Sequence, residues 1–223
     1  MFISRVELPW EAVRNPYHIH QRLWQLFPGC EREARKTGDE PRQGFLFRVE
    51  EQATGRPARL LLQSRLSPAP ADGIQLLGSR EFLPMPAQGQ RLAFVLTANP
   101  VKTIVDAEAA SKPDKLERLA AKQLKRPENP SSLPKSRVPL IQEEEQRDWL
   151  IRRLLEAAEL ESVEILPHPP LYFRKGNRGG KLVTCTFEGV LHVKSPEQLV
   201  NLLENGVGPA KAFGCGLMLV RRA

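Results

Sequence analysis

The chain has 223 residues, and its 33 Lys and Arg against 26 Asp and Glu give a formal net charge of +7. This length suits two domains of about 100 residues each, and the basic surplus favours a polyanionic partner such as nucleic acid. The 3 scattered cysteines, the lack of a signal peptide and the lack of an apolar run of roughly 18 residues argue against a disulfide framework, secretion and a membrane span, so we expect a cytoplasmic protein without membrane contact.

The first part of the chain predicts a βαββαβ unit that ends near residue 88. Strands are indicated by alternating apolar residues, and the helix by apolar residues that recur every three or four positions. In chain order, the expected elements are a strand at 2–8, a helix at 16–27, strands at 44–51 and 58–66, a short helix at 72–77 and a strand at 81–85.

The same order of elements then recurs. The expected elements are a strand at 91–98, a helix at 143–160, a strand at 163–174 with an irregularity marked by its prolines, a strand at 181–193, a helix at 196–204 and a strand at 217–221. Two successive units of this kind predict an α+β fold of two tandem ferredoxin-like (RRM-like) domains, residues 1–88 and 89–223. A single α+β domain is the alternative.

An insertion at about 105–137 interrupts the second unit between its first strand and its first helix. It holds eight Lys and Arg, five Asp and Glu, and four prolines. A loop of this length inside a compact domain is unusual, so we expect it to be mobile or functional. Residues 114–125 are able to form a basic helix on contact with a polyanion, but a solvated charge run is an equal alternative.

The helix expected at 16–27 carries the clearest candidate for catalysis. Asn15 suits the N-cap, Pro16 suits the first helical position, and Pro28-Gly29 ends the helix. Both ends of this helix are therefore marked by residues that favour a start or a stop.

Within this helix, Tyr17, His20 and Trp24 follow one another at i, i+3 and i+7, so they lie on one side, whereas His18 points elsewhere. An imidazole with a pKa of about 6.5 can accept or donate a proton at neutral pH. The alternative is that Tyr17 and His20 are structural residues at the edge of the core.

Three further features could contact phosphate groups. A glycine-rich loop at 205–216 contains Gly206, Gly208, Gly214 and Gly216 together with Lys211. The connection at 174–181 carries Arg174, Lys175, Arg178 and Lys181, and the helix at 143–160 carries Arg152 and Arg153 on its polar side. Each feature has a structural alternative. The glycine-rich loop would be a tight turn, the connection a solvated hairpin, and Arg152 would form an ion pair with Asp148.

No cofactor or metal is expected from the sequence. The glycine-rich loop lacks the spacing of a dinucleotide-binding loop and the Gly-Lys-Ser/Thr ending of a P-loop. The 4 histidines show no metal-ligand spacing, and no Gly-x-Ser-x-Gly elbow is present.

Taken together, these stretches resemble the CasE family, the CRISPR RNA-processing endoribonucleases of the type I-E Cascade complex. The resemblance covers nearly the whole chain, and its ordered motifs are more specific than any single loop. They are FISRVEL, YHIHQRLWQLFP, FLFRVE followed by LLLQS, LTANPVKT at 96–103, SRVPLI at 136–141, YF and TCTFEGVL within 172–191, and GVGPAKAFGCGLMLV at 206–220.

The resemblance implies two ferredoxin-like domains and the stem-loop of CRISPR repeat RNA as substrate. The family's catalytic histidine falls on His20 and its helper tyrosine on Tyr17. Cleavage would need no metal: the ribose 2′-hydroxyl attacks the adjacent phosphorus and leaves a 2′,3′-cyclic phosphate. The protein would stay bound to the mature CRISPR RNA beside other Cascade subunits.

Where some members carry basic residues after the histidine, this chain has Gln21 and Gln25. An auxiliary lysine is therefore expected from elsewhere, with Lys102, Lys181 and Lys211 as candidates. The full set of expected RNA contacts is Arg22, Lys102, Arg152, Arg153, Arg174, Lys175, Arg178, Lys181 and Lys211.

Two non-catalytic alternatives remain open at this point. An RNA-binding protein of two RRM-like domains would present aromatic residues on its central strands, and the segments 44–47 and 186–187 match only fragments of that pattern. A subunit that caps one end of a ribonucleoprotein is the other alternative, and it is compatible with a nuclease that stays with its product.

Overall fold

The computed structural model describes residues 1–29, 44–105 and 135–223. These residues divide into two compact units, one made of Met1–Pro100 with Glu143–Ala223 and one made of Val101–Gln142. None of the helices among them is both long and apolar enough to cross a membrane.

The N-terminal sheet has four antiparallel strands in the order β2-β3-β1-β4. They are β1 (Phe2–Leu8), β2 (Phe45–Glu51), β3 (Ala58–Ser64) and β4 (Gln75–Glu81). Between β1 and β2 the chain forms α1 (Trp10–Val13), α2 (Pro16–Leu23) and the 3₁₀ turn η1 (Trp24–Leu26). The core of this half is built from apolar residues at every second position of the strands and at every third or fourth position of the helical segment. They are Val6, Leu8, Leu60 and Leu62 on the strands and Ile19, Leu23 and Leu26 on the helical segment.

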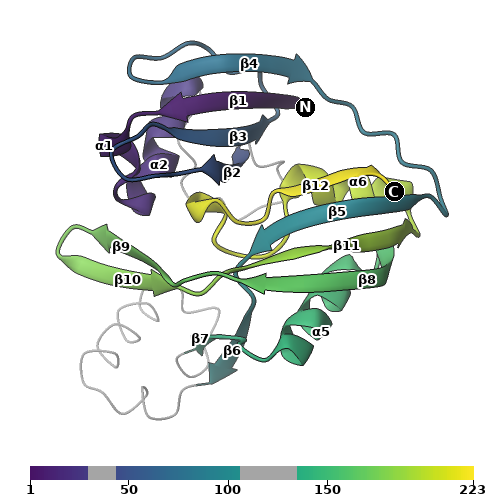
Figure 1. Ribbon diagram of the computed structural model, residues 1–223. Coiled ribbons are helices and arrows are strands. Elements are labelled where there is room, and N and C mark those ends of the chain that lie inside the picture. Colours follow the sequence, from purple (N-terminus) through teal and green to yellow (C-terminus); the bar gives the residue numbers. More distant parts are fainter. Residues whose placement is uncertain (30–43, 106–134) are drawn as a thin grey trace, which may run out of the picture. The chain divides into compact units, whose positions relative to one another are not determined.

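The C-terminal sheet repeats this arrangement in the order β12-β5-β11-β8. Its strands are β5 (Arg91–Ala98), β8 (Ala158–Pro167), β11 (Cys185–Val193) and β12 (Met218–Arg222). The helices are α5 (Glu143–Leu154) and α6 (Pro196–Asn205), and the 3₁₀ turn η2 (Lys211–Phe213) follows α6. A separate hairpin, β9 (Leu171–Lys175) with β10 (Arg178–Leu182), extends from this sheet (Figure 1).

In each sheet the strands, counted along their own half of the chain, stand in the order fourth, first, third, second. This is the ferredoxin-like arrangement, so the predicted α+β fold of two tandem ferredoxin-like domains is confirmed. Leu46 and Leu61 of the first sheet form a small buried cluster with Leu217, next to β12. The predicted boundary near residue 88 remains a prediction, because both sheets belong to one compact unit.

Two of the predicted elements in the N-terminal half are wrong. Residues 72–77 form no helix; a turn bridged by Ala71 and Ile74 leads directly into β4. The strand expected at 81–85 is also wrong, because the fourth strand of this half lies earlier in the chain, at 75–81 (β4). The cause is pairing: β4 hydrogen-bonds along β1 and packs Leu76 against the core, which outweighs a weak local helix preference.

Three predicted elements of the C-terminal half differ from the structure: one helix is shorter, and two strands are each divided in two. The helix expected at 143–160 ends at Leu154, because Ala158 already pairs with Val193 as the first residue of β8. The single strand expected at 163–174 is divided into β8 and β9 around Pro169-Pro170, which have no backbone N–H to donate. The strand expected at 181–193 is likewise divided into β10 and β11.

The second compact unit contains a short hairpin at the ends of the predicted insertion. β6 (Val101–Val105) pairs with β7 (Lys135–Pro139), and Lys102 stands opposite Val138. The expected helix at 114–125 and most of the expected insertion lie outside the described residues.

Candidate active site

The helix α2 begins where the sequence indicates. Asn15 has extended backbone angles, and its side-chain oxygen Oδ1 accepts a hydrogen bond from the Tyr17 backbone N–H at 3.2 Å. Ile19 and Leu23 are buried in the core, and Tyr17 and His20 are half-buried at its edge. The buried face of α2 therefore holds Tyr17 and His20, on the neighbouring face, in a fixed position.

His20 lies among aromatic rings. The centroid of its imidazole is 5.0 Å from that of Phe45, 5.9 Å from that of Trp24 and 6.5 Å from that of Phe47. This burial lowers the pKa of His20 below its usual value of 6.5, since the charged form loses hydration there. At neutral pH the imidazole is therefore neutral and able to accept a proton.

Tyr17 stands at the meeting point of three elements. Its ring centroid is 6.4 Å from that of Phe213 in η2, and the Nζ of Lys175 in β9 is 5.5 Å from the same centroid. The ammonium group over the ring makes a cation–π contact. Tyr17 thus joins the helix of His20 to the basic hairpin and to the glycine-rich loop.

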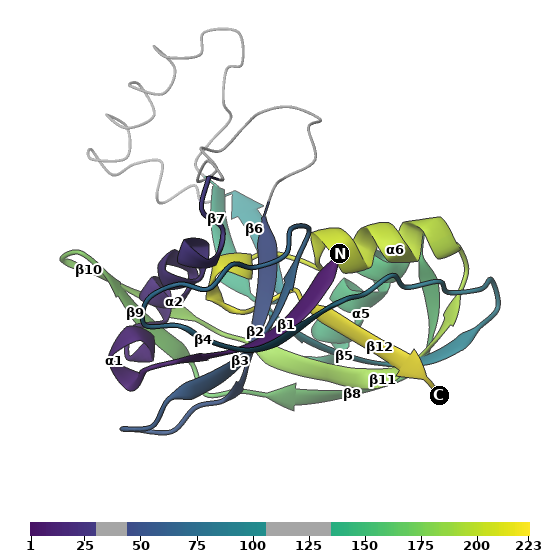
Figure 2. The same ribbon diagram turned by 90° about the horizontal axis from the view of Figure 1, so that it is seen from above.

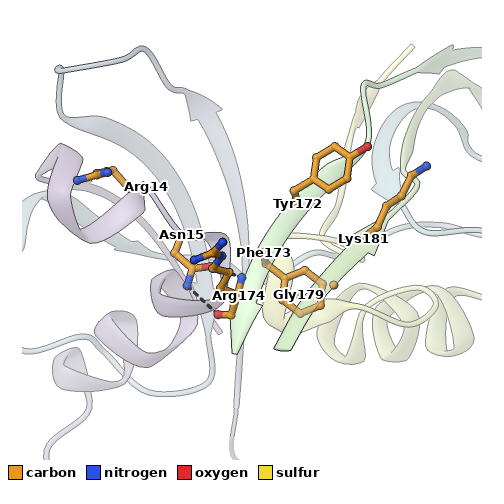
Figure 3. Close-up of a pocket in the computed structure, with 8 residues that line it drawn as sticks. Arg14, Asn15, Tyr172, Phe173, Arg174, Gly179 and Lys181 are labelled. Atoms are coloured by element: carbon orange, nitrogen blue, oxygen red, sulfur yellow. Dashed lines mark hydrogen bonds between the residues drawn. The ribbon is translucent and has the colours of Figure 1, made fainter. Parts of the chain in front are cut away.

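Two cations of the hairpin, Arg174 and Lys181, line an open cavity of about 550 Å³ next to the start of α2 (Figure 3). Lys181 extends over Tyr172, with its Nζ 6.0 Å from the ring centroid. The cavity combines positive charge with an exposed aromatic ring, which suits a nucleotide better than an apolar ligand. The lining residues are Arg14, Asn15, Tyr172, Phe173, Arg174, Gly179, Gly180 and Lys181.

The glycine-rich loop packs against the elements that surround His20. Gly216 donates its N–H to the Thr97 carbonyl at 2.8 Å and accepts from the Val207 N–H at 2.9 Å, which anchors the loop to the C-terminal sheet. A Cβ on Gly214 would stand 3.2 Å from the ring of Phe47, the same ring that faces His20. Gly206, Gly208, Gly214 and Gly216 all have φ between +74° and +91°, where glycine is favoured. A packing role is therefore supported, while phosphate binding by this loop stays a prediction.

The structure brings some of the predicted RNA contacts together and separates others. Arg174, Lys175, Arg178 and Lys181 share the hairpin, and Lys211 lies in η2, which contacts α2. The Nζ of Lys211 donates to the Asn205 carbonyl.

The remaining candidates lie elsewhere. Arg152 and Arg153 belong to α5, which packs on β8 apart from α2 in both views (Figures 1 and 2), and Arg153 lies over the Trp149 ring at 5.5 Å. Arg22 is exposed on α2, and Lys102 lies in β6 of the second compact unit. Among the described residues, no three His, Cys, Asp or Glu side chains gather as a metal site would require.

Several site residues carried no functional signal in the sequence. Phe213 contacts Tyr17, and Arg14 and Tyr172 line the cavity. The sequence indicates Asn15 only as a helix cap, although its side chain also hydrogen-bonds to Arg174 of the hairpin. These roles depend on contacts between residues far apart in the chain, which local patterns do not indicate.

Comparison with known proteins gives consistent matches along the whole chain. A family model described as CRISPR associated protein matches residues 1–222. The CRISPR system Cascade subunit CasE of Escherichia coli strain K12 is 35% identical over 218 residues, which cover 98% of this chain and 98% of the relative. The CRISPR-associated endoribonuclease Cse3 of Thermus thermophilus is 31% identical over 223 residues, 92% of this chain and 90% of the relative. A solved structure of the CRISPR endoribonuclease Cse3 bound to 19 nt RNA superposes with a TM-score of 0.71 at 27% identity, covering 99% of this chain and 100% of that one.

If the aromatic rings around His20 lower its pKa, removing one of them should raise that pKa. Replacing Trp24 by Ala opens the imidazole to water, so the pKa of His20 should rise toward about 6.5. An NMR titration of the RNA-free protein measures it, with Trp10→Ala as a control that removes a second tryptophan of the same core. An equal shift in both variants, or none in Trp24→Ala, would contradict burial as the cause.

Proposed function

Because the chain belongs to the family of CRISPR-associated proteins, we propose that it is a metal-independent endoribonuclease that cuts precursor CRISPR RNA at the repeat stem-loop. The observation that carries this proposal is the position of His20: a half-buried, neutral imidazole one helical turn from Tyr17, beside a basic hairpin. A relative that covers nearly the whole chain bears the name endoribonuclease, and a Cse3 structure holds RNA.

In the proposed reaction the ribose 2′-hydroxyl attacks the adjacent phosphorus. The bond from the 2′-oxygen to phosphorus forms, the bond to the 5′-oxygen breaks, and a 2′,3′-cyclic phosphate remains on the upstream product. His20 takes the proton of the 2′-hydroxyl, which its lowered pKa supports at neutral pH. In-line attack puts the leaving 5′-oxygen on the opposite side of phosphorus, so its proton comes from another group, and Tyr17 is our candidate.

Charge that builds on the phosphate needs a cation nearby. Lys175 and Lys211 both stand beside α2, Lys175 over the ring of Tyr17 and Lys211 within η2. Either one supplies the electrostatic stabilisation that such a transition state requires. Lys181 and Lys102 remain further candidates for this role.

Recognition of the stem is assigned to the hairpin. The cations of β9 and β10 are exposed and suit the phosphate backbone of an A-form stem, whose shape rather than sequence is read by most proteins. Holding the stem there orients the scissile phosphate toward α2. The protein then remains with the mature CRISPR RNA as a subunit of Cascade in the cytoplasm, in keeping with the name of the Escherichia coli relative.

The structure disfavours the RRM-like alternative in its usual form. Phe45, Phe47 and Phe187 are the aromatics that would form its stacking surface, and they are 7%, 0% and 0% exposed. They fill the cores of the two halves instead, so bases have no access to them.

His20→Ala should lower the cleavage rate by about 10² to 10⁴-fold while the dissociation constant for the stem-loop stays near that of wild type. Binding is measured with an RNA that carries a 2′-deoxy group at the cleavage site, and cleavage on a gel. His192→Ala removes a histidine of β11 whose Nε2 pairs with Glu161 at 2.9 Å, and it should cut like wild type. Loss of binding by folded His20→Ala would contradict a purely catalytic role.

Reversing the charge of Arg178 and Lys181 to Glu should weaken stem-loop binding and flatten its salt dependence. Each phosphate contact contributes a slope of about −0.7 to −0.9 in log K against log salt, so the double variant should lose roughly two such contacts. Arg221→Glu with Arg222→Glu, an exposed pair at the end of β12, is the matched control. An unchanged slope in the hairpin variant would mean that the hairpin faces solvent only.

A further inference from the structure

Asn15 pairs with the backbone of the hairpin as an additional strand would. Its Oδ1 accepts the Arg174 N–H at 3.2 Å, and its Nδ2 donates to the Arg174 carbonyl at 2.8 Å (Figure 3). A primary amide side chain presents the same donor and acceptor as a peptide group, so it can satisfy both. These two residues are 159 positions apart in the chain.

The same side chain also caps α2. Oδ1 of Asn15 accepts the Tyr17 N–H at 3.2 Å in addition to the N–H of Arg174. Tyr17 and His20 follow within the first and second turns of this helix. One amide therefore joins the start of the helix that carries the proposed catalytic groups to the edge of the hairpin that carries the cations.

Other contacts in this interface are less directional. Phe173 lies 4.5 Å, between ring centroids, from Phe213, and a Cβ on Gly180 would stand only 2.1 Å from the Phe173 ring, so the ring covers that glycine. Phe213 in turn faces Tyr17. Ring packing allows a strand to slide along its neighbour, whereas paired hydrogen bonds to one residue select a single register.

We propose that Asn15 is a positioning residue, which sets the register of the hairpin against α2 and so brings the phosphate held by the hairpin within reach of His20 and Tyr17. This inference rests on the proposed function, because it needs the hairpin to bind the stem and α2 to cut it. A misplacement of about 1 Å can cost roughly 100-fold in rate, so a register bond outside the reacting groups can control the chemistry.

Two substitutions at this position separate the cap from the pairing. Asn15→Ser keeps a good helix cap but is too short to pair with Arg174 as well. Asn15→Asp keeps the cap and the acceptor for the Arg174 N–H, but places a carboxylate against the Arg174 carbonyl. Gln52→Ala is the matched control: Gln52 donates to the Val13 carbonyl at 3.3 Å, just before the cap, and does not pair with the hairpin among the described residues.

The experiment measures single-turnover cleavage at saturating protein and, separately, the dissociation constant for the uncut 2′-deoxy stem-loop. We expect Asn15→Ser to cut about 10- to 100-fold more slowly than wild type with unchanged binding, Asn15→Asp to fall between the two, and Gln52→Ala to match wild type. A loss of stability alone would not produce this split between rate and binding, nor the partial rescue by Asp.

The outcomes distinguish the inference from the proposed function. If wild type cuts and Asn15→Ser cuts equally fast at saturation, the positioning role is wrong and the proposed function stands. Weaker binding with an unchanged saturated rate would make Asn15 part of RNA binding and also overturn the inference. If wild type does not cut the stem-loop, the proposed function fails and the inference fails with it.

Discussion

The packing of α2 against the N-terminal sheet is the contact on which the site depends. Ile19, Leu23 and Leu26 fill the core, and burial of each such side chain contributes about 1.5–3 kcal/mol. The same contact presses His20 against Phe45, where lost hydration lowers the pKa of the imidazole. Stability and proton chemistry therefore come from one helix, with the apolar face supplying the first and the adjoining face the second.

The site draws its parts from both halves of the chain. The N-terminal half supplies Tyr17 and His20, and the C-terminal half supplies the hairpin cations and Phe213. The glycine-rich loop makes this possible because its left-handed turns let η2 approach α2 while Gly214 leaves room for Phe47. One half thus carries an acid–base group and the other carries a cationic surface. This arrangement suits an enzyme that holds an RNA stem and cuts the strand beside it.

Local physical rules placed the start of α2 but not its end, because the helix predicted over 16–27 ends at Leu23 and continues as the 3₁₀ turn η1. Its cap, its proline and its apolar period predicted the helix and the shared side of Tyr17 and His20, and the repeated order of elements predicted both sheets. The same rules failed at 72–77, where pairing of β4 with β1 decides the structure. They could not find the bond between Asn15 and Arg174, since nothing within a few residues of either one specifies the other. The substrate class came from family resemblance, because net charge alone indicates no more than a polyanion.

The most direct test of this account is the chemical identity of the ends that the protein leaves on a labelled CRISPR-repeat stem-loop in excess EDTA, determined by mass spectrometry. The account predicts an upstream product with a 2′,3′-cyclic phosphate and a downstream product with a 5′-hydroxyl. It also predicts that an RNA with a single 2′-deoxy group at the cleavage site stays intact. A 3′-hydroxyl on the upstream product with a 5′-phosphate on the downstream one, or cleavage of the 2′-deoxy RNA, would contradict it.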